Sequence, residues 1–257
     1  MSINFDFSNK NVLVTGANGD IGSEITSKFL EAGANCICLD KDLKYLKKIT
    51  ISKKYRKKIF FLEINFEKKN FSQIFLKNMQ KNIFIDVLIN NAGYSSSKNF
   101  LEYNYEEWKK TLRINLEIPF LLSQLISKKF MKPGSSIINI TSLAAEQGFP
   151  NNVAYVASKG GLKQLTKAMA IDLSKKNIRV NSVGPGYVKT KMTKKSWLDK
   201  KKRNNRSDRI ILNRWANPSD IANTCLFLGS NLSEYINGQE IYVDGGWLSK
   251  GLKNDKK

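Results

Sequence analysis

Short apolar runs alternate with longer amphipathic stretches along this chain, and the alternation predicts its elements. Seven runs are mostly apolar on both faces, as in a parallel sheet that is covered on both sides. These runs are residues 11–15, 35–40, 59–64, 84–90, 136–141, 178–183 and 240–244. Helical patterns lie between them, at residues 20–32, 42–55, 67–81, 105–131, 152–176 and 218–229. With right-handed crossovers, this order predicts an α/β fold with a doubly wound parallel sheet of about seven strands and helices on both faces.

No linker or internal repeat divides the chain, so residues 1–257 are expected to form one domain. That length, with 41% hydrophobic residues, is sufficient for a packed core. The longest irregular segment is 184–217, which is rich in lysine and arginine. A connection this long is often a functional lid, and we expect it to cover a substrate; a solvated, partly disordered loop is the alternative.

The formal net charge of +21 raises the question of a polyanionic partner. Lysines are spread over almost every expected helix, however, and no nucleic-acid-binding motif accompanies them, so we expect no specific nucleic acid. No apolar run approaches the ~20 residues that span a bilayer, and the first residues lack the layout of a secretory signal. A cytoplasmic protein without a membrane partner is therefore expected.

The chain contains no histidine, which excludes every Ser-His or Cys-His pair. The three cysteines, Cys36, Cys38 and Cys225, lack metal-ligand spacing, so no metal site is expected. Cys36 and Cys38 share a face of one apolar run and are expected to be buried. Proton transfer must then depend on Tyr, Lys, Asp, Glu or a water relay.

Residues 15–22 read TGANGDIG and stand where a strand gives way to a helix, the context that a dinucleotide-binding turn requires. Gly16 permits a tight turn, and Gly22 allows close packing of helix and strand. Asp20 falls in the first turn of the helix and is expected to point away from a bound phosphate. Asp40 ends the next strand and is suited to the adenosine ribose hydroxyls, which favours NAD. Lys41 keeps NADP possible, and a helix N-cap is the alternative role of Asp40.

Tyr155 and Lys159 are four residues apart in a helical pattern, so they share a face. A tyrosine has an ordinary pKa of ~10, and a nearby ammonium is expected to lower it. Tyr155 can then exchange a proton with an alcohol or carbonyl oxygen. Ser142 follows the fifth strand and can donate a hydrogen bond to the same oxygen.

Together these segments resemble the short-chain dehydrogenase/reductase family, in its short single-domain branch. The similarity spans the chain and rests on TGANGDIG, NNAG (90–93), Ser142, YVASK (155–159), PG (185–186), RWANPSDIA (214–222) and INGQEIYVDGGW (236–247). The glycine spacing itself is more similar to the family's extended branch. The resemblance implies a Rossmann-like fold, a homotetramer, and catalytic roles for Ser142, Tyr155 and Lys159. It adds Asn115 as a fourth member, which holds a water that links Lys159 to solvent.

The resemblance also implies which residues contact the nicotinamide dinucleotide. They are Gly16, Asn18, Gly19, Asp20, Ile21, Gly22, Asp40, Asn65, Asn91, Ala92, Gly93, Tyr155, Lys159, Pro185, Gly186, Val188 and Thr190. Thr190 has a helix N-cap as its alternative role.

The substrate is expected to be a small molecule. Residues 189–209 hold many cations against only Asp199 and Asp208, which favours an anionic substrate, although the chain-wide lysine excess explains the same pattern. The ending VDGGWLSKG is similar to family members that oxidise sugar acids or polyols. Alternatives are a 3-oxoacyl-thioester reductase, an NAD-retaining epimerase or dehydratase, and a non-catalytic basic module.

Overall fold

The computed structural model describes residues 5–42, 53–79 and 83–251, and its described part is built on one seven-stranded sheet. The strands are β1 (Asn11–Thr15), β2 (Asn35–Asp40), β3 (Ile59–Glu63), β4 (Val87–Asn90), β5 (Ser136–Ile140), β6 (Arg179–Pro185) and β7 (Glu240–Val243). All pairs are parallel, in the order β3-β2-β1-β4-β5-β6-β7. The predicted doubly wound sheet is confirmed.

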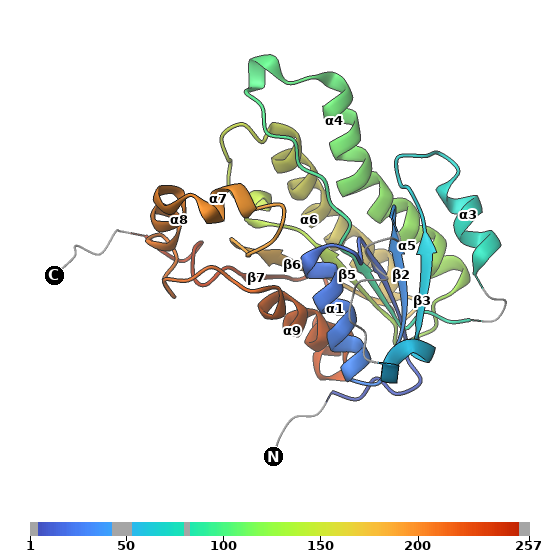
Figure 1. Cartoon of the computed structure of the whole chain (residues 1–257). Coiled ribbons are helices and arrows are strands. Elements are labelled where there is room, and N and C mark those ends of the chain that lie inside the picture. Colours follow the sequence, from blue (N-terminus) through green and yellow to red (C-terminus); the bar gives the residue numbers. More distant parts are fainter. Residues whose placement is uncertain (1–4, 43–52, 80–82, 252–257) are drawn as a thin grey trace.

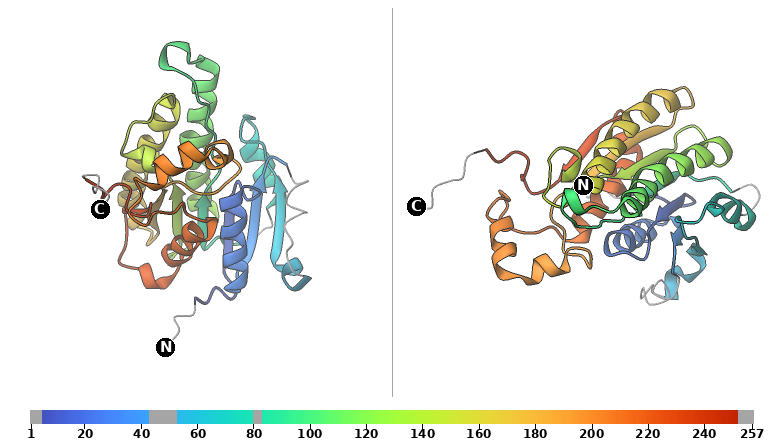
Figure 2. Two further views of the ribbon diagram at one scale, coloured as in Figure 1. Left: turned by 60° about the vertical axis from the view of Figure 1, so that its left-hand side comes forward. Right: turned by 90° about the horizontal axis from the view of Figure 1, so that it is seen from above.

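Helices cover both faces of the sheet (Figures 1 and 2). One face carries α1 (Asp20–Glu31) and α9 (Pro218–Gly229), which pack against each other. The other carries α3 (Phe71–Asn78), α4 (Tyr105–Leu112), α5 (Ile118–Lys129) and α6 (Val153–Ser174). Each face has its own apolar core, and the three cysteines are buried as unpaired thiols in the core under α1 and α9. Burial was expected for Cys36 and Cys38.

Several expected elements differ in extent. Strand 84–90 begins only at Val87, and the helix expected over 67–81 spans Phe71–Asn78. Most of the helix expected over 42–55 lies outside the described residues, and the part that is described, Lys53–Lys58, forms a 3₁₀ turn.

The helix expected over 105–131 is not continuous. It divides into α4 and α5 around a π-helical turn, Arg113–Glu117, and Pro119 stands at the start of α5, where its missing N–H is tolerated. The wider turn places Asn115 at the junction, completely buried. Such single π turns are frequent at functional sites, and this one faces the cavity described below.

The segment 184–217 is more ordered than the sequence predicts, since it forms α7 (Lys194–Leu198) and α8 (Lys200–Ser207). α8 buries no residue, and the side chain of Asp199 caps it by accepting a hydrogen bond from the N–H of Lys202. Cation–π contacts hold it instead. The guanidinium carbon of Arg203 lies 5.2 Å from the Trp197 ring centre, and that of Arg206 lies 4.6 Å from the Tyr187 ring centre.

These aromatic rings belong to a small third core. Buried Leu143, Ile210, Trp215 and Trp247 form its centre. The Tyr187 ring meets Trp215 at a tilt and Trp247 edge-on, at ring-centre distances of 5.1 and 5.0 Å. The cluster joins the segment after β6 to the segment after β7. Sequence periodicity could not reveal it, because the contributing residues come from distant parts of the chain.

The approach of α1 to β1 gives the first prediction. A Cβ atom on Gly22 would lie 2.2 Å from the carbonyl oxygen of Gly16 and 2.7 Å from Nδ2 of Asn91. Gly22→Ala should therefore lower the free energy of unfolding by about 1–3 kcal/mol, measured by urea denaturation. Gly160→Ala is the control, since nothing lies within 4 Å of its Cβ in α6, and it should be neutral or stabilising by up to ~1 kcal/mol. Equal urea midpoints for both variants would contradict the packing argument.

Candidate active site

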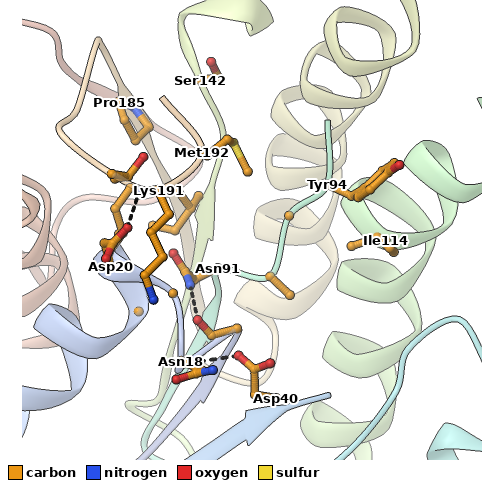
Figure 3. Close-up of a pocket in the computed structure, with 18 of the residues that line it drawn as sticks. Asn18, Asp20, Asp40, Asn91, Tyr94, Ile114, Ser142, Pro185, Lys191 and Met192 are labelled. Carbon is orange, nitrogen blue, oxygen red and sulfur yellow. Dashed lines mark hydrogen bonds between the residues drawn. The ribbon is translucent and has the colours of Figure 1, made fainter. Parts of the chain in front are cut away.

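A cavity of about 730 Å³ opens at the carboxyl edge of the sheet. It lies next to the neighbouring strands β1 and β4, from which the two halves of the sheet are wound in opposite directions. Its walls come from the turn after β1, the ends of β2, β4 and β5, the start of α6 and the segment after β6 (Figure 3). Apart from Asn115, every residue predicted from the sequence for the site lines this cavity.

Hydrogen bonds from Asn91 and Thr15 fix the glycine turn. Nδ2 of Asn91 donates to the carbonyl oxygens of Thr15 and Gly16, at 3.0 and 3.1 Å. Oγ1 of Thr15 accepts from the N–H groups of Asn91 and Ala92, at 2.9 and 3.0 Å. Gly16 has φ of +61°, and a Cβ there would lie 2.8 Å from Cα of Ala92, so only glycine suits the position.

The start of α1 fits the pyrophosphate of a dinucleotide. Its N-cap residue is Gly19, which makes no side-chain capping bond, so no side chain satisfies the free N–H groups at this positive helix end. Phosphates bind at such helix starts.

Asp40 points back toward the turn (Figure 3). Its Oδ2 accepts from the N–H of Asn18 at 2.9 Å, and its Oδ1 accepts from the N–H of Lys41 at 2.7 Å. Both carboxylate oxygens keep lone pairs that can accept from ribose hydroxyls. The alternative N-cap role concerns the helix expected over 42–55, most of which lies outside the described residues.

Asp20 does not point away from the cavity, contrary to expectation. Its Oδ2 accepts from the backbone N–H of Lys191 at 2.5 Å, and the pair lies on the cavity wall (Figure 3). The bond joins the first turn of α1 to the segment after β6, 171 residues away in sequence. Asp20 therefore connects the glycine turn to that segment, and the N–H of Lys191 partly offsets the negative charge of its carboxylate.

Ser142 and Tyr155 face each other across the cavity end near β5. Oγ of Ser142 accepts from the N–H of Ala144 at 3.2 Å, which leaves its hydroxyl proton to donate to the phenol oxygen of Tyr155. Burial raises the pKa of Tyr155, and the hydrogen bond from Ser142 opposes that rise. The pKa of Tyr155 is thus raised in the protein alone, not lowered as expected, because burial outweighs the hydrogen bond from Ser142.

Lys159 is buried on the next turn of α6. Its Nζ donates to the carbonyl oxygen of Ile140 at 2.7 Å and lies 5.7 Å from the centre of the Tyr155 ring. Burial lowers the pKa of Lys159 to about 8, and the negative charge of Glu240 acts against that decrease. The predicted pairing of Tyr155 and Lys159 on one helix face is present.

Asn115 does not line the cavity but supports one wall of it. Its Nδ2 donates to the carbonyl oxygen of Tyr94 at 2.8 Å and to Oγ of Ser158 at 3.0 Å, and its Oδ1 accepts from the N–H of Tyr94 at 2.8 Å. The side chain therefore joins the segment after β4 to the helix that carries Tyr155.

Thr190 closes a turn with Thr193 rather than capping a helix. The two hydroxyl oxygens are 3.2 Å apart, and α7 begins one residue later, at Lys194. Sequence reasoning missed several further wall residues, which are Ile64, Phe66, Glu67, Tyr94, Ile114, Ile140, Thr141, Lys191, Met192 and Thr193. All of them are within three residues of a predicted site residue, so adjacency was the only signal available.

Two structural findings concern other kinds of site. In the described ranges 5–42, 53–79 and 83–251, no three acidic or cysteine side chains gather closely enough to hold a metal ion. None of the helices in those ranges has the length and apolar character needed to cross a membrane.

Comparison with known proteins places these features in a family. Residues 16–248 match the family model described as Enoyl-(Acyl carrier protein) reductase. The 5-keto-D-gluconate 5-reductase of Escherichia coli strain K12 is 32% identical over 256 residues, covering 95% of this chain and 97% of that protein.

Solved structures agree closely with this fold. A 4-hydroxyisoleucine dehydrogenase complexed with NADH superposes with a TM-score of 0.88 at 30% identity, covering 95% of this chain and all of the other. A structure described as an NAD(P)-dependent gluconate 5-dehydrogenase from Beutenbergia cavernae, with bound NADP, has a TM-score of 0.88 at 27% identity, covering 96% and 100% of the two chains.

The bond between Asp20 and Lys191 gives a prediction for Asp20→Ala. Losing a charge-assisted hydrogen bond should promote local opening of residues 189–202, so trypsin should cleave there about tenfold faster. Time-resolved mass spectrometry of the fragments measures the rate.

Asp6→Ala is the matched control, because Asp6 also accepts from a backbone N–H, that of Ser8, at 2.8 Å, but does so near the amino end of the chain. If both variants are cleaved at the rate of the parent protein, Asp20 does not tie the segment.

Proposed function

Because the chain belongs to the short-chain dehydrogenase/reductase family, we propose that it transfers a hydride between a nicotinamide cofactor and a secondary alcohol or ketone of the sugar-acid or polyol class. The observation that carries the proposal is the grouping of Ser142, Tyr155 and Lys159 at one end of a cavity whose other end is a nucleotide turn. A bound nicotinamide supplies or accepts the hydride. The chain's own residues must then place the substrate oxygen and move its proton.

Tyr155 is the proton carrier. Its hydroxyl gives a proton to a carbonyl oxygen during reduction, and its phenolate takes one from an alcohol during oxidation. Ser142, which donates toward the same phenol oxygen, stabilises charge on the substrate oxygen once that oxygen occupies the space between them. Since burial raises the pKa of Tyr155, the protonated acid is its resting form in the protein alone.

Lys159 supplies the positive charge beside the phenolate. Its ammonium offsets the negative charge that appears on Tyr155 when the proton leaves, at a position where water is largely excluded. Asn115 acts through its contacts, because it fixes Tyr94 and Ser158. The proposal also includes a water, held by Asn115, that links Lys159 to solvent.

Asp40 favours NAD as the cofactor. A carboxylate at the end of β2 accepts from ribose hydroxyls and repels a 2′-phosphate. Lys41 also lines the cavity and supports NADP as the second candidate. Relatives with either nucleotide are known, as the NADH and NADP complexes above illustrate.

The substrate class rests on the sugar-acid relatives and on the many cations of residues 189–209. Of these residues, Lys191 lines the cavity, and Arg203 and Arg206 lie against aromatic rings. An anionic substrate under a cover formed by 184–217 is part of the proposal. Relatives named 3-oxoacyl-[acyl-carrier-protein] reductase, which are 34% identical over 238 residues, favour a 3-oxoacyl-thioester reductase as the second candidate. A cytosolic location and a homotetramer complete the proposal.

Tyr155→Phe tests the proton carrier. Losing the phenol should reduce kcat by about 10²–10⁴-fold with NAD or NADP and a panel of sugar acids, polyols and 3-oxoacyl thioesters. Nucleotide affinity, measured by calorimetry, should stay within about twofold. Tyr235→Phe is the matched control, since Tyr235 is fully exposed and should retain full activity. Parent-level turnover in the Tyr155 variant would refute the assignment.

Asp40→Asn tests the cofactor preference. The amide oxygen can still accept from the N–H of Asn18, but the charge that repels a 2′-phosphate is lost. The ratio of kcat/KM for NADP to that for NAD should rise about tenfold or more, corresponding to on the order of 1.4 kcal/mol. Glu63→Gln serves as control, because Glu63 is the strand partner of Asp40 on β3 but does not line the cavity. An unchanged ratio in Asp40→Asn would show that Asp40 does not select the nucleotide.

A further inference from the structure

Glu240 is a carboxylate within the sheet, behind the candidate active site. It pairs with Ser182 of β6, and its side chain shares a face with that of Tyr242. Both side chains lie over Gly184, where a Cβ atom would come 2.4 Å from the Tyr242 ring and 2.7 Å from Oε1 of Glu240. A glycine on β6 thus makes room for an acid on the face that α6 covers. An acid so placed needs hydrogen bonds and a nearby cation.

Two hydroxyl groups hold the carboxylate. Thr141 donates to Oε1, and Ser182 donates to Oε2 at 3.0 Å. The Thr141 hydroxyl also lies 3.0 Å from the carbonyl oxygen of Val183, so its one proton serves two acceptors. Thr141 directly precedes Ser142, and Lys159 donates to the neighbouring carbonyl of Ile140. Glu240 therefore contacts the short segment from which the catalytic hydroxyl projects.

The charges around Glu240 come from several elements. Burial raises the pKa of Glu240, whereas Thr141, Ser182, Lys163 and Lys159 lower it. Lys163, one turn after Lys159 on α6, forms an ion pair with Glu146, which follows the turn after Ser142.

The phenol of Tyr242 also donates to Glu146, at 3.0 Å. Glu146 thus compensates Lys163, while Glu240 is the carboxylate whose charge acts on Lys159. Tyr155 also faces Lys159, and Asp244 stands beyond Tyr242 on the chain.

We propose that Glu240 is a positioning residue for hydride transfer: its half-buried carboxylate, held by Thr141 and Ser182, fixes the Thr141–Ser142 segment and keeps the ammonium of Lys159 charged beside Tyr155. The effect on hydride transfer rests on the proposed function. The effect of the Glu240 charge on the pKa of Lys159 can be measured in the protein without cofactor or substrate. Removing the negative charge makes the protonated form of Lys159 less stable, so Lys159 loses its proton at lower pH.

The experiment follows the Cε resonances of ¹³C-labelled lysines against pH. Ordinary lysines titrate near ~10.4, so the buried Lys159 is distinguished by its titration at about 8, and Lys159→Arg assigns it by loss of the resonance. In Glu240→Gln, we expect this resonance to titrate about one pH unit lower. Glu240→Asp should restore most of the parent behaviour.

Glu146→Gln is the matched control, since it removes an equal charge that is paired with Lys163 instead, and it should move the Lys159 titration much less. Glu240→Met keeps the volume without the charge and replaces Glu240→Gln if that variant does not fold. A Lys159 titration unchanged in the charge-free variants overturns the proposal, even if the parent protein proves to be an active dehydrogenase.

Kinetics give the second readout. At pH 8, Glu240→Gln should lower kcat by about fivefold, because a downward shift of one unit from a pKa of about 8 reduces the charged fraction of Lys159 from about one half to about one eleventh. KM should stay within about twofold, since Glu240 does not line the cavity. A raised KM with unchanged kcat would assign Glu240 to structure alone. Absence of turnover in the parent protein would refute the proposed function and leave the titration result standing.

Discussion

The junction between β1 and β4 is the constraint on which the site depends. The two strands lead into oppositely wound halves of the sheet, and Thr15 and Asn91 join their carboxyl ends through four hydrogen bonds. Because one of these bonds reaches the carbonyl oxygen of Gly16, they hold the glycine turn against the end of β4. The proton-transfer residues on β5 and α6 are then placed relative to a fixed edge.

The sequence predicted the sheet well because strands buried on both faces have an unmistakable apolar pattern. It also predicted most of the cavity wall, since the turn after β1 and the Tyr155–Lys159 pair are local in sequence. The sequence did not predict contacts between segments that are distant along the chain. The bond from Lys191 to Asp20 and the support that Asn115 gives to Tyr94 depend on packing, and the π-helical turn interrupts a helical pattern that looks continuous.

The electrostatics were the least predictable part. Proximity to Lys159 suggests a more acidic Tyr155, but desolvation has the larger effect on both groups, raising the pKa of one and lowering that of the other. Likewise, a net charge of +21 suggests an anionic partner, yet two arginines of α8 form cation–π contacts with aromatic rings instead. Burial and local geometry decide what each charge does, and neither is visible in a count of residue types.

The way α8 is attached has a consequence for solubility. A helix that docks through leucines exposes hydrocarbon to water whenever it detaches, and such surfaces promote aggregation. α8 buries no residue and docks through the guanidinium groups of Arg203 and Arg206. If the helix detached, these cations would become hydrated, and the newly exposed apolar surface would be that of the Trp197 and Tyr187 rings. Detachment of α8 thus adds no apolar surface to the part that moves.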